Sequence, residues 1–388
     1  MGCFPHLHGR VKRLLLIDCH TNDKQLGSNS HGIAMNRAPT LQDVARASGV
    51  SRSTAARALS GSGYVEQGKR QIIEETANRL GYRGSAAART LRTRRSHTVG
   101  ILIADITNPI FPRIVRGADE VLTREEMTLL LCNTDQKPER QQAFVREMLE
   151  RMADGLILVS QSVGSEIVEM LRKGPPVVFI NRTPEPGAFD YVGPANAEGI
   201  DALVDHLTDY GHRRLGFVRG PTNSSTACER FDRFVQKLRL LGLPLPRSAI
   251  YDGDYNMEAG RAAADALLNV PTSERPTAIL GANDFVALGL IDRAKELGFS
   301  VPEDLSVTGF DDAFGEAAWQ RAFPNAPRMT TIEQPRREIG RRAATLLLDR
   351  LANPSRPPSR IVVPVSFVRG TTTAAPAPLR QRSNRVGR

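Results

Sequence analysis

The chain has 388 residues, and its 52 lysines and arginines outnumber 42 aspartates and glutamates, which gives a formal net charge of +10. This length fits two or three domains at about 100–200 residues each. Hydrophobic residues make up 40% and charged residues 24%, the composition of an ordinary globular protein. No stretch approaches the roughly 18–20 apolar residues of a transmembrane helix, so a membrane-spanning protein is not expected.

The positive charge is concentrated near the N-terminus. Residues 36–96 carry a net +8 and residues 1–35 a net +2, whereas the rest of the chain is balanced. Because four arginines lie in the last nine residues, residues 97–379 carry a net −4. A small basic segment joined to a mildly acidic body indicates an arm that binds a polyanion such as nucleic acid, and the alternative is a solvated basic surface.

The cysteines give no sign of a disulfide framework or a zinc site, because no C-x-x-C joins Cys3, Cys19, Cys132 and Cys228. A reducing compartment fits this pattern, so we expect a cytoplasmic protein. Cys19 and His20 could form a metal cluster with His6 and His8, but the spacing matches no known ligand pattern. We therefore expect no metal.

Residues 1–35 are predicted to be a disordered extension. The apolar run Leu14–Ile17 follows Lys12 and Arg13 as in a signal peptide, but its four residues fall short of the roughly 7–15 that such a segment needs. Export is therefore not expected. Compact patterning begins only after Met35, which we interpret as the true start of the protein.

Two short helices are predicted at the start of the basic segment. Thr40 and Asp43 have the spacing of a capping box, which predicts a helix beginning at Leu41. Gly49 falls in a tight turn, and Ser51 can cap a second helix that runs to Leu59. Two helices joined in this way form a helix-turn-helix, which places its second helix in the major groove of DNA.

A third helix is predicted at about Lys69–Leu80, where Ile72, Ile73, Ala77 and Leu80 have helical spacing and Gly81 follows. Ser85 can then cap a helix of about seven residues over 86–92. Isolated helices this short are marginal in water, so we expect this one to form only when something holds it.

From Thr98 onward, apolar runs alternate with helical patterns. This alternation predicts an α/β core in which parallel sheets carry helices on both faces. Polar side chains stand where the runs end, and ligands of such sheets bind at the carboxyl ends of strands. The expected strands are 99–105, 127–133, 154–160, 176–181, 215–220, 277–283 and 305–312.

Signatures of catalysis are missing from the sequence. There is no P-loop, no H-E-x-x-H, no G-x-S-x-G and no G-x-G-x-x-G after a strand. A serine, a histidine and an aspartate could be combined into a triad only by chance, because the seven histidines are scattered. An enzyme is therefore the weakest hypothesis.

Five segments together resemble the LacI/GalR family of bacterial transcription regulators. They span about Thr40 to Thr371 and follow the family's order: TLQDVARASGVSRSTAARAL, an alanine-rich stretch ending at Leu91, GILIADITNPIF, ANDFVALGLIDRAKELGFSVPEDLSVTGFDD and MTTIEQP. The resemblance implies an all-α helix-turn-helix headpiece, a hinge helix, and a two-subdomain α/β core like a type I periplasmic binding protein, in which the ligand lies between the subdomains.

The resemblance also sets the expected boundaries. The chain should cross between the subdomains near Asn196, Arg328 and Arg356. The expected parts are a disordered extension (1–35), the headpiece (36–83), the hinge helix and linker (84–96), the first subdomain (97–195 plus 329–355), the second subdomain (196–328 plus 356–371) and a disordered tail (372–388).

For DNA binding, the resemblance implies that Arg52, Ser53 and Arg57 read base edges in the major groove and that Leu91 is a wedge in the minor groove. Phosphate contacts and hinge positions complete the set: Thr40, Leu41, Ser51, Thr54 and Ala88. The simpler alternatives are solvated arginines on a surface helix and a leucine that packs in a linker.

Two departures concern the DNA side. Where the family usually has Val-Ser-Arg-Val, this chain has Ala-Ala-Arg-Ala at 55–58, which removes a hydroxyl and thins the headpiece core. Where the family usually enters the hinge with Pro-Asn, this chain has Gly84 and Ser85. Since glycine raises the entropy lost on ordering, we expect the hinge helix to depend strongly on DNA.

For the effector, the resemblance implies that Arg230 clamps ligand oxygens and that carboxylates, amides and an aromatic ring pair with a sugar or sugar-like molecule. The matching positions are Asp105, Asn108, Phe111, Asn181, Arg230, Asn283 and Asp311. Asn108 and Asp311 could instead only cap helices. Trp319, the single tryptophan, is assigned to the same site, with a place in the core as the alternative.

Two further departures concern the pocket. Arg233 stands where the family commonly has glycine, and Ala195 stands where aspartate is frequent. We expect no cofactor beyond the small-molecule effector. Some members of the LacI/GalR family form tetramers through a leucine-heptad tail, which this chain lacks, so we expect a homodimer. Its expected partner is a palindromic operator, and no membrane is expected. The function predicted is an allosteric repressor that senses a carbohydrate, and the alternative is a solute-binding protein of a sugar transporter.

Overall fold

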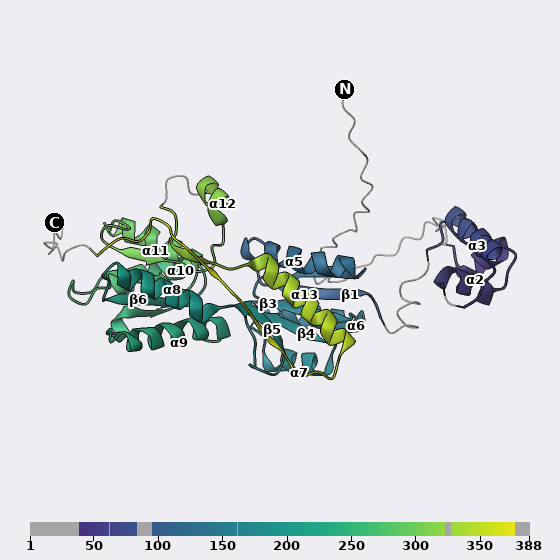
Figure 1. Ribbon diagram of the computed structural model, residues 1–388, viewed down its shortest axis with the longest axis horizontal. Coiled ribbons are helices and arrows are strands. Elements are labelled where there is room, and N and C mark those ends of the chain that lie inside the picture. The colour runs from purple at the N-terminus through teal and green to yellow at the C-terminus, as the bar shows by residue number, and fades with distance from the viewer. Residues whose placement is uncertain (1–38, 62, 84–94, 161, 323–326, 377–388) are drawn as a thin grey trace, which may run out of the picture. The chain divides into compact units, whose positions relative to one another are not determined.

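The computed structural model describes residues 39–376 except 62, 84–94, 161 and 323–326 (Figure 1). The described residues divide into a small N-terminal unit, called the headpiece here, and a large unit that follows from Thr98, called the sensor. The expected extension 1–35, most of the hinge with Ala88 and Leu91, and residues 377–388 of the expected tail lie outside the described residues. Within the described part, no helix is long and apolar enough to cross a membrane.

The headpiece consists of three helices, α1 (Leu41–Ala47), α2 (Arg52–Ser60) and α3 (Gln67–Leu80). Thr40 and Asp43 form the expected capping box on α1, and Ser51 caps α2. Gly61 and Gly81 take positive φ values of 67° at the ends of α2 and α3, a conformation that side-chain-bearing residues avoid. The helix-turn-helix that the sequence predicts is therefore present.

One detail of α3 differs from the prediction. The helix begins two residues earlier than expected, and the residues that enter the headpiece core are Ile73, Thr76 and Ala77. Ile72 is 54% exposed, because it lies one position off the buried face.

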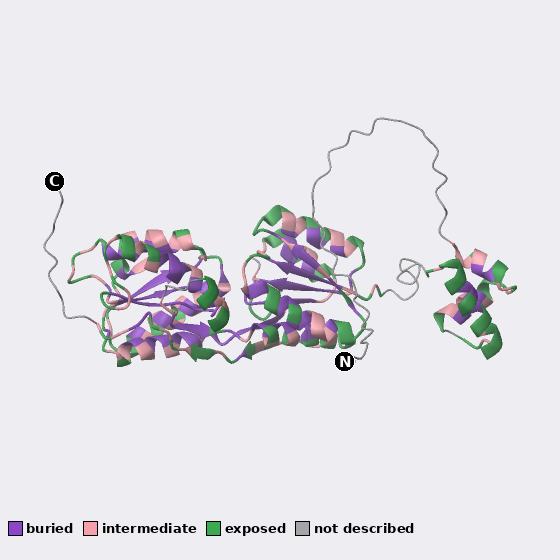
Figure 2. Cartoon of the chain, turned by 90° about the horizontal axis from the view of Figure 1, so that it is seen from above, coloured by how far each residue is buried: buried purple, intermediate pink, exposed green. Residues whose placement is uncertain are grey.

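The first sheet of the sensor is fully parallel and has the order β11-β5-β4-β3-β1-β2. Its strands are β1 (Thr98–Ile103), β2 (Thr128–Asn133), β3 (Gly155–Val159), β4 (Val177–Ile180), β5 (Asp190–Pro194) and β11 (Arg360–Val363). The associated helices are α5 (Ile110–Arg124), α6 (Pro138–Glu150), α7 (Ser165–Lys173) and α13 (Arg336–Ala352). Figure 2 shows buried residues along the strands and exposed outer faces on the helices.

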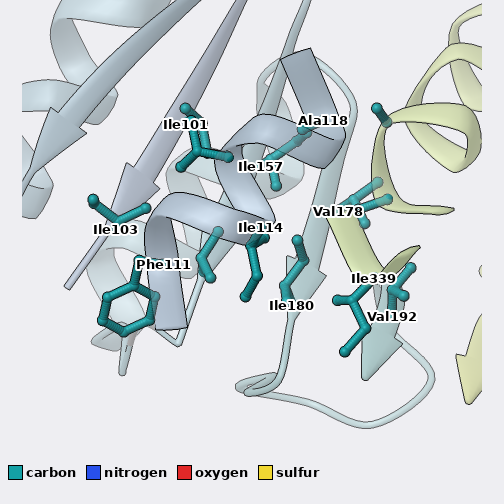
Figure 3. Close-up of a cluster of buried hydrophobic side chains, with 14 of the residues drawn as sticks. Ile101, Ile103, Phe111, Ile114, Ala118, Ile157, Val178, Ile180, Val192 and Ile339 are labelled. Atoms are coloured by element: carbon teal, nitrogen blue, oxygen red, sulfur yellow. The ribbon is translucent and has the colours of Figure 1, made fainter. Parts of the chain in front are cut away.

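Alternate residues of β1 face opposite sides of this sheet. Ile101 joins Ile157 of β3, Ile114 of α5 and Ile339 of α13 in one apolar cluster (Figure 3). Helices α5 and α13 approach closely, since a Cβ atom on Gly117 would lie 2.0 Å from the Arg337 carbonyl oxygen. The other face receives α6, because a Cβ atom on Gly100 of β1 would meet the α6 methionine Met148.

The second sheet is also parallel, with the order β7-β6-β8-β9. Its strands are β6 (Leu215–Arg219), β7 (Ile250–Asp252), β8 (Ala278–Gly281) and β9 (Ser306–Thr308). The helices around it are α8 (Asn196–Asp209), α9 (Ser225–Leu240), the 3-10 turn η1 (Arg247–Ala249), α10 (Met257–Leu268), α11 (Asp284–Glu296) and α12 (Gly315–Ala322). A separate antiparallel pair joins β10 (Thr331–Glu333) to β12 (Ser366–Val368).

The chain crosses between the two parts of the sensor three times. The first crossing lies between β5 and α8, at the expected position near Asn196. The other two fall later than expected. Ile332 of β10 packs in the core of the second sheet, so the second crossing lies just before α13. Strand β11 pairs with β5 of the first sheet and β12 with β10, so the third crossing lies between β11 and β12.

Residues 329–333 were therefore wrongly assigned to the first subdomain, and residues 356–363 to the second. The prediction of a disordered tail also fails for its first residues. The Thr372 hydroxyl donates to the Val307 carbonyl oxygen (2.6 Å), and the Ala374 N–H donates to Ser306 Oγ (3.0 Å). These residues are ordered because β9 offers backbone and hydroxyl partners that no local pattern reveals.

Candidate functional site

Helix α2 presents its polar face to solvent while its other face is packed. Ala55 is 0% and Ala58 3% exposed in the headpiece core, whereas Arg52, Ser53 and Arg57 are exposed. Among the described residues, no carboxylate forms an ion pair with Arg52 or Arg57. Both guanidinium groups are thus available to a partner outside the chain.

The N-termini of α1 and α2 are already capped from within. The Thr54 N–H donates to Ser51 Oγ (3.1 Å), and the Ser51 hydroxyl also lies 2.8 Å from Thr54 Oγ1. At α1, the Thr40 hydroxyl donates to Asp43 Oδ2 (2.7 Å) next to the half-buried Leu41. A carboxylate therefore stands where the resemblance implies a phosphate contact, and repulsion between the two weakens the case for Thr40.

A cavity of about 340 Å³ lies in the sensor, and its walls come from both sheets. This volume is at the small end of the range for ligand pockets, roughly 300–1,000 Å³. Of the effector residues expected from the sequence, the structure brings seven together here: Asp105, Asn108, Phe111, Asn181, Arg230, Asn283 and Asp311.

Trp319 does not line this cavity, and its assignment to the effector site was wrong. It lies on α12, is 2% exposed, and packs in the apolar cluster of the second sheet, with its ring 6.0 Å from that of Phe314. The alternative interpretation, a place in the core, is the one that the structure bears out.

Arg230 on α9 is the centre of a buried polar network at the cavity. It is 3% exposed and donates from Nε to Asn196 Oδ1 (2.9 Å) and from Nη1 to the Ala282 carbonyl oxygen (2.7 Å). Its Nη2 lies 3.3 Å from Asp311 Oδ1, and its guanidinium stacks 3.6 Å from the centre of the Phe310 ring. These contacts with the start of α8 and with the segments after β8 and β9 fix the position of the Arg230 guanidinium.

Burial opposes ionisation of the carboxyl groups beneath the cavity. Desolvation raises the pKa of Asp311, although the Arg230 charge acts in the opposite direction. Burial together with the charge of Asp311 raises the pKa of Asp284 to about 7. Asp284 accepts hydrogen bonds from the Thr331 hydroxyl (2.6 Å) and the Ala313 N–H (2.7 Å), which tie the start of α11 to β10.

Two predicted residues accept a hydrogen bond from a backbone N–H at the start of a helix as well as lining the cavity. Asn108 Oδ1 accepts from the Ile110 N–H (3.1 Å) at the start of α5, and Asn283 Oδ1 accepts from the Val286 N–H (2.9 Å) at the start of α11. Asp105 Oδ1 accepts from the backbone and hydroxyl of Thr107. Part of the hydrogen-bonding capacity of these side chains is therefore committed within the chain.

Several lining residues were missed by the sequence analysis. Gln334 lies in the quoted MTTIEQP segment, so its motif could have revealed it. The loop before α10 contains no motif that marks it as a wall of the cavity. The missed residues are Ala104, Thr107, Ile110, Gln136, Ser160, Thr226, Tyr255, Asn256, Met257, Glu258, Phe285 and Gln334.

Two buried acceptor atoms at the cavity have no partner among the described residues. They are Oδ1 of Asn181, which is 8% exposed, and Oε1 of Gln334, which is 3% exposed. Buried polar atoms are rarely left unpaired, because each costs about 1–3 kcal/mol. The cavity thus offers acceptors to a ligand that carries hydroxyl or N–H groups.

No group of His, Cys, Asp or Glu that could hold a metal occurs in the residues that the structure describes. The cluster considered around Cys19, with His6, His8 and His20, lies outside them.

Comparison with known proteins identifies both units. Residues 40–85 match the family model described as bacterial regulatory proteins, lacI family, and residues 204–373 match the periplasmic binding protein-like domain. The chain is 34% identical to catabolite control protein A of Priestia megaterium over 79% of this chain and 91% of the relative. It is 30% identical to the ribose operon repressor of Escherichia coli (strain K12) over 86% and 99%.

A solved structure shows the same architecture. The crystal structure of a LacI family transcriptional regulator from Enterococcus faecium with bound ribose has a TM-score of 0.61 and 29% identity. The match covers 72% of this chain and 99% of that chain.

Proposed function

The chain belongs to the LacI family of bacterial regulatory proteins and is a DNA-binding transcriptional regulator, and from this premise we propose how it is switched. It binds a near-palindromic operator as a homodimer and represses transcription. A small polyhydroxylated effector, a sugar or sugar derivative, enters the sensor cavity and changes the affinity for DNA.

The observation that carries the proposal is a cavity lined from both sheets of the sensor. A ligand that contacts Asp105 and Asn181 after strands of the first sheet, and Arg230 and Asn283 beside the second, stabilises one relative position of the two. The ligand shifts the equilibrium between two conformations of the sensor only by the difference in its affinity for them. The hinge transmits this shift to the headpieces.

Homodimerisation follows from the size of the headpiece. A single helix-turn-helix buries too little surface for tight specific binding, so two must act on half-sites of one operator. The exposed Arg52 and Arg57 of each α2 would each form a bidentate pair with guanine, worth about 1–3 kcal/mol of discrimination. Leu91 and Ala88 would contact the minor groove from the hinge.

The effector class follows from the residue types around the cavity. Amide and carboxylate oxygens accept hydrogen bonds from hydroxyl groups, and Phe111 offers an apolar face to the C–H edge of a ring. No organic cofactor is needed for this cycle. A regulator of this kind would meet its operator in the cytoplasm, at the nucleoid.

Operator binding tests the proposal. Fluorescence anisotropy with DNA from the protein's own promoter region should give nanomolar affinity that falls steeply with salt. Arg57→Ala should weaken binding by about tenfold or more, whereas Arg146→Gln, on the outside of the sensor, should not. A sugar-binding protein without operator affinity would instead support the transporter alternative, and one affinity with and without every effector would refute the switch.

A further inference from the structure

One cation at the effector cavity has no carboxylate partner among the described residues. Arg182 follows β4 and lines the cavity, where its Nη1 donates to Ser162 Oγ (3.1 Å) and its guanidinium lies 5.1 Å from the centre of the Tyr255 ring. A hydroxyl and an aromatic face stabilise the group without neutralising its charge.

The electrostatic surroundings of Arg182 are unfavourable to its charge. Burial is the largest influence and lowers the pKa of Arg182, and the nearby Arg230 acts in the same direction. Tyr255 and Asp254 oppose them only in part. Since arginine stays protonated in proteins, the side chain keeps a positive charge that an anion would stabilise.

Several other buried or partly buried arginines of the sensor pair with carboxylates. Arg230 has Asp311, and Arg350 and Arg356 share Asp190, with ion-pair distances of 3.3, 2.9 and 2.9 Å. Burying a cation without such a partner is costly. Arg336, which is 2% exposed and has no ion pair among the described residues, donates instead to the carbonyl oxygens of Asp311 and Asp312 (3.1 and 2.8 Å). Arg182 differs because it lines the cavity, where a ligand can supply the acceptor.

Three carboxylates line the cavity, and none pairs with Arg182; Asp311 is the partner of Arg230. Asp105 Oδ1 already accepts two hydrogen bonds from Thr107, and Glu258 is exposed to solvent. Neither residue is among the groups that chiefly shift the Arg182 pKa. The carboxylates that line the cavity therefore leave Arg182 without an ion pair in the described structure.

A second, independent observation defines the rest of the ligand. Asn181 is the neighbour of Arg182 in the chain, and its buried Oδ1 has no donor in the described structure, while Gln334 Oε1 is unpaired in the same way. Both residues line the cavity. Each oxygen requires a hydroxyl or N–H group, whereas Arg182 requires an acceptor with negative charge.

We infer that the effector is an anionic polyol, whose hydroxyl groups donate to Asn181 and Gln334 and whose carboxylate or phosphate is bound by Arg182. This inference rests on the proposed function in so far as the cavity is the effector site. A carboxylate and a phosphate both match the planar, bidentate donors of a guanidinium, so a sugar acid and a sugar phosphate share the required chemistry.

Matched ligands test the inference on the full-length protein. Isothermal titration calorimetry is run with ribose, glucose and galactose, and with the aldonate and the phosphate ester of each. We expect at least one anionic ligand to bind about tenfold to hundredfold more tightly than its neutral parent, as a charged hydrogen-bonded pair implies. The aldonate and phosphate arms show which anion the site takes.

Variants show whether Arg182 is the cause. R182Q should reduce the ratio between the anionic ligand and its parent to about one, and R182K should keep part of it as a point charge. R146Q removes an exposed arginine that pairs with Glu166 away from the cavity, and it should keep the full ratio. Because R182K retains the charge, it also reveals whether loss in R182Q is only misfolding.

Three results would overturn the inference: equal binding of neutral and anionic ligands, a preference that survives R182Q, or binding by none of the anionic ligands. Operator binding of the wild-type protein is measured separately. Anion preference without operator binding would refute the proposed function and leave the inference standing. Operator binding without anion preference would refute the inference alone.

Discussion

The headpiece and the sensor bury their apolar residues in different ways. Four of the six buried residues in the headpiece cluster are alanines, and the two larger ones are Val44 and Ile73. The clusters of the sensor consist mainly of isoleucine, leucine, valine and phenylalanine on two sheets. Because burial of apolar area is the main source of stability, the sensor should tolerate lesions that the headpiece does not.

A large truncation in the sensor gives the largest expected effect. Phe234 on α9 is 0% exposed, and its ring lies 4.8 Å from that of Phe217. Phe234→Ala should lower the free energy of unfolding by about 3–5 kcal/mol. Urea denaturation followed by the fluorescence of Trp319, the single tryptophan, reports the sensor alone. An unchanged midpoint would contradict the importance of this cluster.

A smaller truncation should do more damage to function when it lies in the headpiece. Val44→Ala removes about 2 kcal/mol of apolar stabilisation from a core with few large side chains. Operator affinity should fall strongly, whereas the unfolding transition of Trp319 should not move. If DNA binding survives Val44→Ala, the headpiece is more stable than its thin core implies and the contrast with the sensor is lost.

The sensor should also respond to pH through Asp284. The raised pKa of Asp284 means that the folded state binds the proton more tightly than the unfolded state. The contribution of Asp284 to the free energy of unfolding is therefore full at low pH and is lost as pH rises through about 7. Burial lowers the pKa of His206 and His212, which act in the opposite direction near pH 6.5. The wild type must therefore be compared with Asp284→Asn, in which the histidines are unchanged.

From pH 6 to pH 8, the wild type should lose about 1 kcal/mol of unfolding free energy relative to Asp284→Asn. Trp319 fluorescence in urea at each pH measures both proteins. Parallel pH profiles for the two would show that Asp284 is ionised throughout this range.

Matched caps give an expected effect as small as that of Asp284. Ser51 caps α2 in the headpiece and Ser224 caps α9 in the sensor, where its Oγ accepts from the Ala227 N–H (3.4 Å). Each change to alanine should cost about 1 kcal/mol. Ser51→Ala should weaken operator binding, whereas Ser224→Ala should shift only the Trp319 midpoint. If Ser51→Ala and Ser224→Ala affected DNA binding equally, the headpiece would be stable enough to tolerate the loss of the α2 cap.

Much of the fold could be predicted because it depends on local patterns. The caps at Thr40 and Ser51, the turn at Gly49 and the apolar runs of the long strands act within a few residues. Strands β10 and β11 were not predicted in this way, although an apolar run revealed β9, which is just as short. Strand β10 and strand β11 have three and four residues, and their partners lie far away in the chain.

The same division applies to the functional residues. The sequence by itself determined the exposed arginines of α2 and the polar residues at strand ends, because helical periodicity and strand termini fix where such side chains point. Only the tertiary structure decided that Trp319 packs in the core and that Arg182 lacks a carboxylate. Hydrogen-bond and ion-pair partners come from distant segments, so the unpaired oxygens of Asn181 and Gln334 become visible only when both sheets are in place.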